Sequence, residues 1–231
     1  INKNKGIMKK LLTVIFLVFG SFTLVSADIG VNIGGSVAIG EYSAVGSENE
    51  NTEVSAKRTE KAYGGMGSLF IEKELGFLPG PLKRLTLGYD SVLHDVSTGT
   101  RDTNRNNREG SSNTTVAVQQ KVSADLTNIA SVYATLRITD WLYVKGGEIS
   151  LDVKTTESLT TGSQYGDASL TGTIMGFGLA HKTDNGLFFR AEYLDTEIDG
   201  ITLTSTTNAD NSVTLDGIDG ESVAISIGKT F

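Results

Sequence analysis

The last eleven residues, Glu221-Ser-Val-Ala-Ile-Ser-Ile-Gly-Lys-Thr-Phe231, alternate between two kinds of side chain. Val223, Ile225 and Ile227 share one parity with Phe231, whereas small or polar residues fill the other. Successive side chains of a β-strand point to opposite faces, so this stretch is predicted to have one apolar face and one small, polar face. The alternation continues to the terminal phenylalanine.

Seven further segments show the same period of two, and none has the period of a helix. They are residues 29–40, 63–75, 85–90 and 115–138, a segment from Trp141, residues 169–181, and a segment from Leu187. The chain is therefore predicted to be all-β, with eight strands.

The predicted connections alternate in length. Three are short: Pro79-Gly80-Pro81, Thr139-Asp140 and the hairpin turn Thr183–Gly186. The intervening connections are long and polar, for example residues 98–113. In an antiparallel up-and-down barrel this order places the short turns at one end and the long loops at the other. That asymmetry is typical of transmembrane barrels with short periplasmic turns and long external loops.

Charged residues at mid-strand positions distinguish the inner face from the outer one. The polar parity carries Glu72, Glu74, Asp90, Arg137, Arg190 and Glu192. An eight-stranded barrel has an interior just wide enough for side chains to fill, and buried charges must be paired. We therefore expect these residues to form a luminal charge network that plugs the barrel, with an ion path through the network as the alternative.

The strand from Trp141 shows an apparent change of phase. Leu142 and Val144 are apolar at even positions, whereas Ile149, Leu151 and Val153 are apolar at odd ones. A β-bulge is most easily accommodated at glycine, which predicts one at Gly146-Gly147. On that interpretation the luminal residues of this strand are Tyr143, Lys145, Glu148 and Asp152.

Two further patterns favour a membrane barrel. Aromatic residues lie within a few positions of the short turns, as in an interfacial girdle: Trp141, Tyr143, Phe188, Phe189 and Phe231. Some strands exceed the 9 to 11 residues, approximately, that cross a bilayer. Residues 201–204 and 212–215 are predicted to extend one hairpin beyond the membrane, in a Thr- and Ser-rich sheet that could bind partners at its edge.

The first 27 residues have the features of a secretory signal peptide. Four lysines and no acidic residue precede about 14 mostly apolar residues, followed by Val25-Ser26-Ala27. We expect cleavage between Ala27 and Asp28, with translation starting at Met8. Residues 28–231 would then form a single barrel domain that reaches the outer membrane through the periplasm.

Composition excludes several other classes of protein. Loss of the four leader lysines changes the formal charge from −7 to about −11, which disfavours nucleic-acid binding. The chain has no cysteine, so a lipoprotein anchor or a disulfide framework is excluded. His94 and Asp95 alternate in face and cannot converge on one catalytic site. The Asp-Gly pairs of the last loop lack calcium-loop spacing. No enzyme activity, cofactor or metal is predicted.

The terminal stretch resembles the C-terminal signal of bacterial outer-membrane proteins. Val223, Ile225, Ile227 and Phe231 match that signal and Gly228 fits it, whereas Lys229 departs from the apolar residue that is usual there. Leu187-Phe-Phe-Arg-Ala-Glu-Tyr193 is similar to the penultimate strand of small OmpA/OmpX-type barrels, and the whole chain from residue 28 resembles that superfamily.

The resemblance implies a location and a set of partners. They are outer-membrane lipids, lipopolysaccharide, the barrel-insertion machinery and periplasmic chaperones, and the protein would be a monomer. The expected role is structural or adhesion-like, through the external loops. Two alternatives stay open: a narrow channel or transporter for small solutes, and a soluble exported barrel that binds a ligand.

Overall fold

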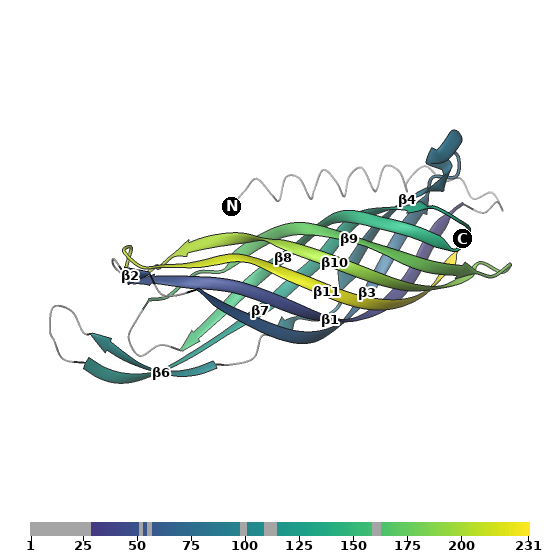
Figure 1. The fold of residues 1–231 in the computed structure, drawn as a ribbon. Coiled ribbons are helices and arrows are strands. Elements are labelled where there is room, and N and C mark those ends of the chain that lie inside the picture. The colour runs from purple at the N-terminus through teal and green to yellow at the C-terminus, as the bar shows by residue number, and fades with distance from the viewer. Residues whose placement is uncertain (1–28, 51–52, 55–56, 98–100, 109–114, 159–162) are drawn as a thin grey trace.

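The computed structural model describes residues 29–50, 53–54, 57–97, 101–108, 115–158 and 163–231. Within these ranges, eight antiparallel strands form one closed barrel (Figure 1). In order around the wall they are β1 (Val31–Glu50), β3 (Arg58–Glu74), β4 (Leu85–Val92), β7 (Thr115–Arg137), β8 (Leu142–Ser158), β9 (Ala168–Lys182), β10 (Leu187–Thr204) and β11 (Ser212–Thr230). Pairing of β11 with both β10 and β1 closes the barrel.

This is the eight-stranded up-and-down barrel that the period of two predicted and that the resemblance to OmpA/OmpX-type barrels implies. Three shorter strands lie outside the wall's order: β2 (Glu53–Val54) pairs with β1, and β5 (Val96–Ser97) and β6 (Arg101–Arg108) pair with β7. No helix in the described ranges is long and apolar enough to cross a membrane. The predicted signal peptide, with Met8, Ala27 and Asp28, lies outside the described residues.

The short connections lie together at one end of the barrel, here called the turn end, where Phe231 also lies (Figure 1). Thr139 Oγ1 accepts hydrogen bonds from the backbone N–H groups of Trp141 and Leu142, which fixes the second turn. Gly186 has φ +83°, as the predicted hairpin turn requires. The connection that contains Pro79–Pro81 joins β3 to β4 close to the predicted strand ends and includes a 3₁₀-helix, η1 (Gly80–Arg84).

The opposite end, the loop end, is built from strands that extend well beyond the others (Figure 1). Ile201 pairs with Leu215 and Thr204 with Ser212, so the predicted extended hairpin of β10 and β11 is confirmed. Thr202 and Thr214 are hydrogen-bonded through their hydroxyls at 3.0 Å. The barrel therefore carries a polar β-sheet extension on its loop end.

The outer face of the barrel carries the large apolar side chains. Ile225 is 68% exposed, whereas its neighbours Ala224 and Ser226 are 2% and 3% exposed and point into the barrel. The same arrangement on the other strands produces a band of exposed apolar residues, here called the apolar belt. Its members include Val37, Ile39, Leu69, Leu87, Val144, Met175, Phe177, Leu179, Phe189, Val223, Ile225, Ile227 and Phe231.

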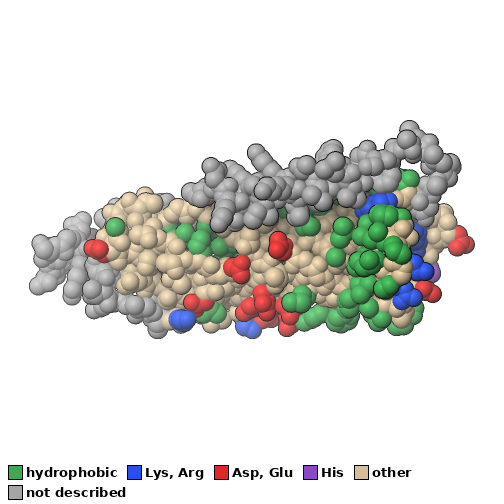
Figure 2. All heavy atoms as spheres, turned by 90° about the horizontal axis from the view of Figure 1, so that it is seen from above, with side chains coloured by type: hydrophobic (Ala, Val, Ile, Leu, Met, Phe, Trp, Pro, Cys, Tyr) green, Lys and Arg blue, Asp and Glu red, His purple; other side chains and the backbone are tan. Residues whose placement is uncertain are grey.

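On the face shown in Figure 2, most exposed apolar side chains gather in the turn-end part of the barrel. Beyond it, toward the loop end, a row of carboxylates begins: Glu41 pairs with Glu221, and Glu221 pairs with Asp195. Nine residues, Val223 to Phe231, cover the height of the belt. At a rise of about 3.3 Å and a tilt of about 40°, they span about 23 Å, close to the 25 Å or so of a transmembrane barrel's apolar band.

Two of the predicted girdle aromatics face inward instead. Tyr143 and Phe188 are buried inside the barrel, which agrees with the separate prediction that Tyr143 is luminal, whereas Trp141, Phe189 and Phe231 are half exposed on its outer face. Period-two parity explains the difference, because Phe188 and Phe189 are neighbours and must point to opposite faces. Inside the barrel, a Cβ atom at Gly178 would overlap the Tyr143 ring, so glycine at that position makes room for the aromatic side chain.

Candidate functional site in the lumen

A buried ion pair spans the lumen near the turn end. Arg190 on β10 donates hydrogen bonds from Nη1 to Glu72 Oε1 at 2.5 Å and from Nη2 to Glu72 Oε2 at 2.6 Å. Glu72, on β3, is 0% exposed. It also accepts hydrogen bonds from Tyr133 Oη at 2.9 Å and Asn32 Nδ2 at 3.0 Å. The carboxylate is thus fully surrounded by donors, which is the condition for burying it.

A second group of charges lies beside this pair. Lys145 Nζ on β8 is 3.5 Å from Glu192 Oε1 on β10, and both side chains are buried. Lys145 also lies over the ring of Tyr133, 3.9 Å from its centroid. Asp90 on β4 accepts a hydrogen bond from Ser68 Oγ at 2.7 Å. Glu72, Arg190, Lys145, Glu192 and Asp90 are here called the ionic layer, and they come from four strands of the wall.

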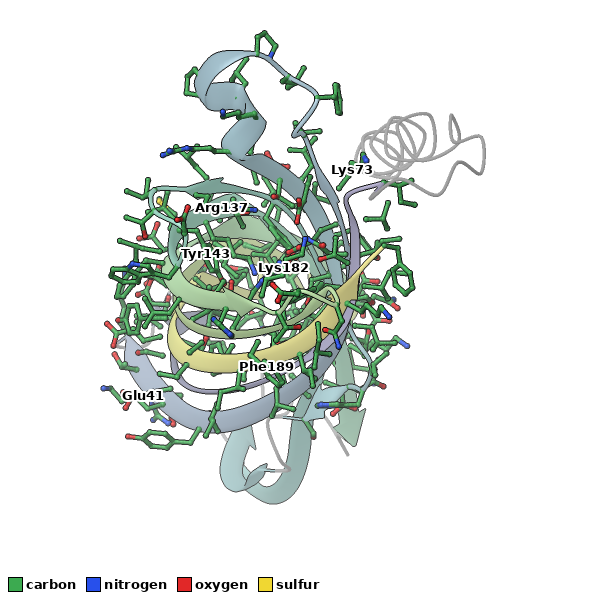
Figure 3. All side chains as sticks on the ribbon, turned by 90° about the vertical axis from the view of Figure 1, so that its right-hand side faces the viewer. Glu41, Lys73, Arg137, Tyr143, Lys182 and Phe189 are labelled. Atoms are coloured by element: carbon green, nitrogen blue, oxygen red, sulfur yellow. The ribbon has the colours of Figure 1, made fainter. Side chains whose placement is uncertain are left out.

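Three further charged residues line the mouth of the barrel at the turn end. Arg137 Nη2 and Lys182 Nζ lie 3.9 and 3.7 Å from Glu74 Oε1. Figure 3, which looks into this end, shows Arg137, Tyr143 and Lys182 within the ring of strands and Glu41 outside it. Glu74 and Arg137 therefore belong to a more exposed group that also includes Lys182, a residue that the sequence analysis does not single out. Asn32 Nδ2 links this group to the ionic layer, because it donates to both Glu74 and Glu72.

The structure corrects the placement of Glu148 and Asp152. β8 pairs with β9 in one unbroken register from Leu142 to Val153, so Gly146-Gly147 form no bulge. Glu148 is exposed on the outer face, and Asp152 Oδ1 accepts a hydrogen bond there from Ser169 Oγ. The irregularity is instead on β7, between Thr127 and Ala130.

The unbroken register turns the apolar residues of β8 toward the inside of the barrel. Leu151 packs with Ile129, Leu170 and Ile198 in a buried cluster, here called the apolar layer. Ile149 and Val153 pack against that cluster. The loop-end half of the lumen is therefore apolar, whereas the turn-end half is charged. This division is the reason that apolar residues occur at both parities of β8.

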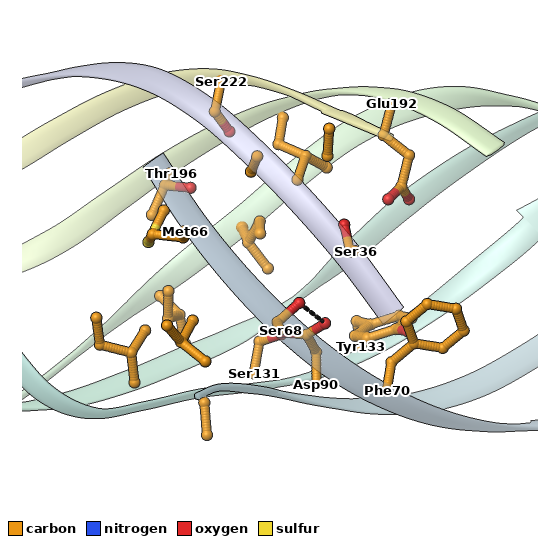
Figure 4. A pocket seen from close by; sticks show the side chains of 18 of the residues that line it. Ser36, Met66, Ser68, Phe70, Asp90, Ser131, Tyr133, Glu192, Thr196 and Ser222 are labelled. Carbon is orange, nitrogen blue, oxygen red and sulfur yellow. Dashed lines mark hydrogen bonds between the residues drawn. The ribbon is translucent and has the colours of Figure 1, made fainter. Parts of the chain in front are cut away.

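A cavity of about 130 Å³ lies between the ionic layer and the apolar layer. Its lining includes Asp90, Lys145, Arg190 and Glu192 from the ionic layer and Ile129, Leu151 and Ile198 from the apolar layer. Figure 4 shows Asp90 and Glu192 reaching into this space from opposite walls, with Met66 and Thr196 farther toward the loop end. The lumen is thus closed by side chains at two levels and hollow between them.

The comparisons with known proteins give the following. No protein-family model matches the chain, and no curated protein is similar enough in sequence to count as a relative. Among solved structures, the attachment invasion locus protein Ail of Yersinia pestis is 15% identical, with a TM-score of 0.36, over 85% of this chain and 99% of Ail. The outer membrane protein OprG of Pseudomonas aeruginosa is 12% identical, with a TM-score of 0.36, over 86% and 96% of the two chains.

The outer membrane protease OmpT of Escherichia coli is 9% identical, with a TM-score of 0.39, over 90% of this chain and 99% of OmpT. At this level of identity and TM-score, such likenesses carry no conclusion about the activity of this chain. The functional argument therefore rests on the residues of the barrel itself.

Proposed function

We propose that this protein is a bacterial outer-membrane β-barrel that does not conduct solutes at rest and acts at the cell surface through its loop-end extension. One observation carries the proposal: the barrel has its apolar side chains outside and its paired charges inside. Ile225 is 68% exposed, whereas Glu72 is 0% exposed. A soluble barrel has the opposite arrangement, because it buries its apolar parity.

The apolar belt needs a lipid environment. Soluble monomers rarely expose contiguous apolar patches larger than about a few hundred Å². The belt surrounds the barrel, and its height matches a bilayer's hydrocarbon core in the outer membrane. The carboxylates of Glu41, Asp195 and Glu221 lie just beyond the belt, at the level where the membrane surface begins. In this orientation the turn end faces the periplasm and the loop end faces the exterior.

The ionic layer supports a closed lumen. A bidentate Arg190–Glu72 pair crosses the interior, and Lys145 and Glu192 fill the space beside it. Opening a path would separate a buried ion pair, which costs several kcal/mol per ion, by order of magnitude. A narrow channel is the competing function, favoured by the hollow between the two layers.

The surface role and the partners follow from this orientation. The extended β10–β11 hairpin presents Thr202 and Thr214 to the exterior, where a partner could add a strand or contact the polar surface. The belt would contact outer-membrane lipids and lipopolysaccharide. The terminal strand, ending in Phe231, would be recognised by periplasmic chaperones and the barrel-insertion machinery before it is folded.

The experiment is to refold the protein in detergent and to compare unboiled and boiled samples by gel electrophoresis. A folded transmembrane barrel is expected to migrate differently from its boiled form and to float with lipid vesicles. Planar-bilayer recordings should show no stable conductance. A large ohmic open state would favour the channel, and a protein that stays soluble without detergent and shows no mobility shift would contradict the membrane location.

A further inference from the structure

The cavity between the ionic layer and the apolar layer has a charge imbalance on one side. In the part of the chain that the structure describes, the ionic layer contains three carboxylates, Glu72, Asp90 and Glu192, and two cations, Arg190 and Lys145. Arg190 is engaged by Glu72 through both Nη atoms, and Lys145 lies 3.5 Å from Glu192. The fifth charge, Asp90, accepts a hydrogen bond from the uncharged Ser68 hydroxyl, and its nearest cation is Lys145, which it shares with Glu192.

One negative charge of the ionic layer is therefore in excess. Asp90 is partly buried, and Lys145 alone cannot neutralise both Asp90 and Glu192, so a second cation that enters the cavity would be stabilised beside them. Asp90 and Glu192 both line the cavity, and they come from β4 and β10, which lie opposite each other in the strand order. A cationic group between them would receive carboxylate oxygens from two sides (Figure 4).

The rest of the cavity wall is mixed: hydroxyls such as those of Ser36, Ser131 and Thr196 line its middle, and apolar residues close its loop end. Ile129, Leu151 and Ile198 close it toward the loop end, and Ile174, Leu194 and Ala224 form a second buried cluster on its side. A cavity of about 130 Å³ is comparable to an engineered apolar cavity of roughly 150 Å³ that binds benzene. The space therefore fits a body of about one aromatic ring rather than a lipid chain.

We propose that the lumen binds a small organic amine, with its ammonium group between Asp90 and Glu192 and its apolar body against the apolar layer. The amine completes the charge balance of the ionic layer, and its apolar body covers the apolar residues that close the loop end of the cavity. The inference does not depend on the surface role of the loop-end extension. The inference assigns a ligand site to the cavity, whereas a lumen closed by the ionic layer would not need one.

The test uses the folded protein in lipid nanodiscs with three fluorinated probes of one size: 4-fluorophenethylamine, 2-(4-fluorophenyl)ethanol and 4-fluorophenylacetate. Binding is followed by ¹⁹F NMR. The amine is expected to bind saturably, and the acetate is expected not to bind. Asp90→Asn should weaken amine binding about tenfold or more, the effect of losing a charge-assisted hydrogen bond. It should change binding of the alcohol by less than about twofold, which is the scatter expected of an unrelated contact.

A matched pair of variants separates the cavity from the surrounding lipid. Ala38→Leu fills the cavity, whereas Ala134→Leu adds the same carbons on the outer face. Amine binding should be lost in the first variant and kept in the second. The gel shift on boiling shows that each variant is folded. Asp90→Ser removes the same charge with a different side chain and serves as a second variant.

Three results would overturn the proposal. The first is equal amine uptake by wild type and Ala38→Leu, which would be partition into lipid. The second is acetate binding as tight as amine binding. The third is amine binding that neither Asp90→Asn nor Asp90→Ser weakens, which would leave an apolar cavity without selectivity for a cation.

Discussion

Arg190 and Glu72 are 118 residues apart in sequence and share two parallel hydrogen bonds, of 2.5 and 2.6 Å, across the inside of the barrel. The pair joins β10 to β3, which are not neighbours in the wall. Phe70 and Phe188 flank it, with their ring centroids 5.5 and 4.5 Å from the guanidinium carbon. The pair therefore connects distant parts of the barrel wall in a largely buried setting.

Removal of the arginine should destabilise the barrel strongly. Arg190→Ala leaves Glu72 buried without its cation, and we expect a loss of about 3–5 kcal/mol in the free energy of unfolding. Urea unfolding of the refolded protein in lipid vesicles measures it. The double variant Arg190→Met with Glu72→Gln removes both charges and should recover most of that loss. A cost below about 1 kcal/mol for Arg190→Ala, the usual value of an exposed pair, would show that the pair is solvated.

A charged residue introduced on the apolar belt should destabilise the folded barrel more strongly the deeper it lies in the bilayer. Ile225→Arg places a cation near the middle of the belt and is expected to cost about 2–4 kcal/mol, whereas Glu221→Arg on the same face should cost about 0–1 kcal/mol. The two sites lie on one strand and one face, so the introduced arginine differs between them mainly in its depth in the membrane. Unfolding in vesicles provides the measurement, and equally small costs at both sites would mean that this face meets water.

The terminal phenylalanine should matter more for assembly than for stability. Its backbone N–H donates to Val31 O at 2.8 Å, and its side chain is half exposed. Phe231→Ala keeps the backbone pairing, so the refolded protein should lose only about 1–2 kcal/mol, from partial loss of an apolar side chain. In cells the same variant is expected to accumulate in the periplasm and be degraded, if the insertion machinery recognises the unfolded strand as proposed.

Cell fractionation and immunoblotting compare the variant with Thr230→Ser, which keeps the terminal aromatic residue. Outer-membrane levels of Phe231→Ala equal to wild type would indicate that the phenylalanine serves only the folded barrel.

Export should depend on the small residue before the predicted cleavage point. Ala27→Leu is expected to block processing, because the cleavage site requires a small side chain. An immunoblot should then show a precursor that is heavier by the leader. Mature protein of normal size in this variant would place the cleavage elsewhere, and Thr23→Leu within the apolar segment is a control that should leave processing intact.

The wall of the barrel could be predicted from sequence because strand parity is a local property. Ile225 and Arg190 lie on different faces of their strands, and a period of two fixes that choice. The partner of Arg190 could not be predicted, because it depends on how far each strand is displaced along its neighbour. By parity alone, Glu74 and Glu192 are as good candidates for the partner of Arg190 as Glu72 is.

The error on β8 has a physical cause. The predicted bulge assumes that apolar residues of every strand face outward, but Ile149 and Leu151 lie in or against the apolar layer inside the lumen. The bulge on β7 was missed because no glycine marks it. Asn128 adopts φ 53° there and donates a hydrogen bond to Asp152 Oδ2 at 2.8 Å, and asparagine tolerates this left-handed conformation better than most residues. In the sequence, the bulge is marked only by Asn128 itself, a polar residue within a long strand.

The central claim is that the apolar belt contacts lipid, and tryptophan fluorescence in brominated vesicles tests it most directly. The chain has one tryptophan, Trp141, so Trp141→Phe provides a silent background. In that background, Ile225→Trp should be strongly quenched by phosphatidylcholine brominated at the middle of its acyl chains, and Glu221→Trp should be quenched weakly. Weak and equal quenching at both positions would contradict the account, because the belt would then face water.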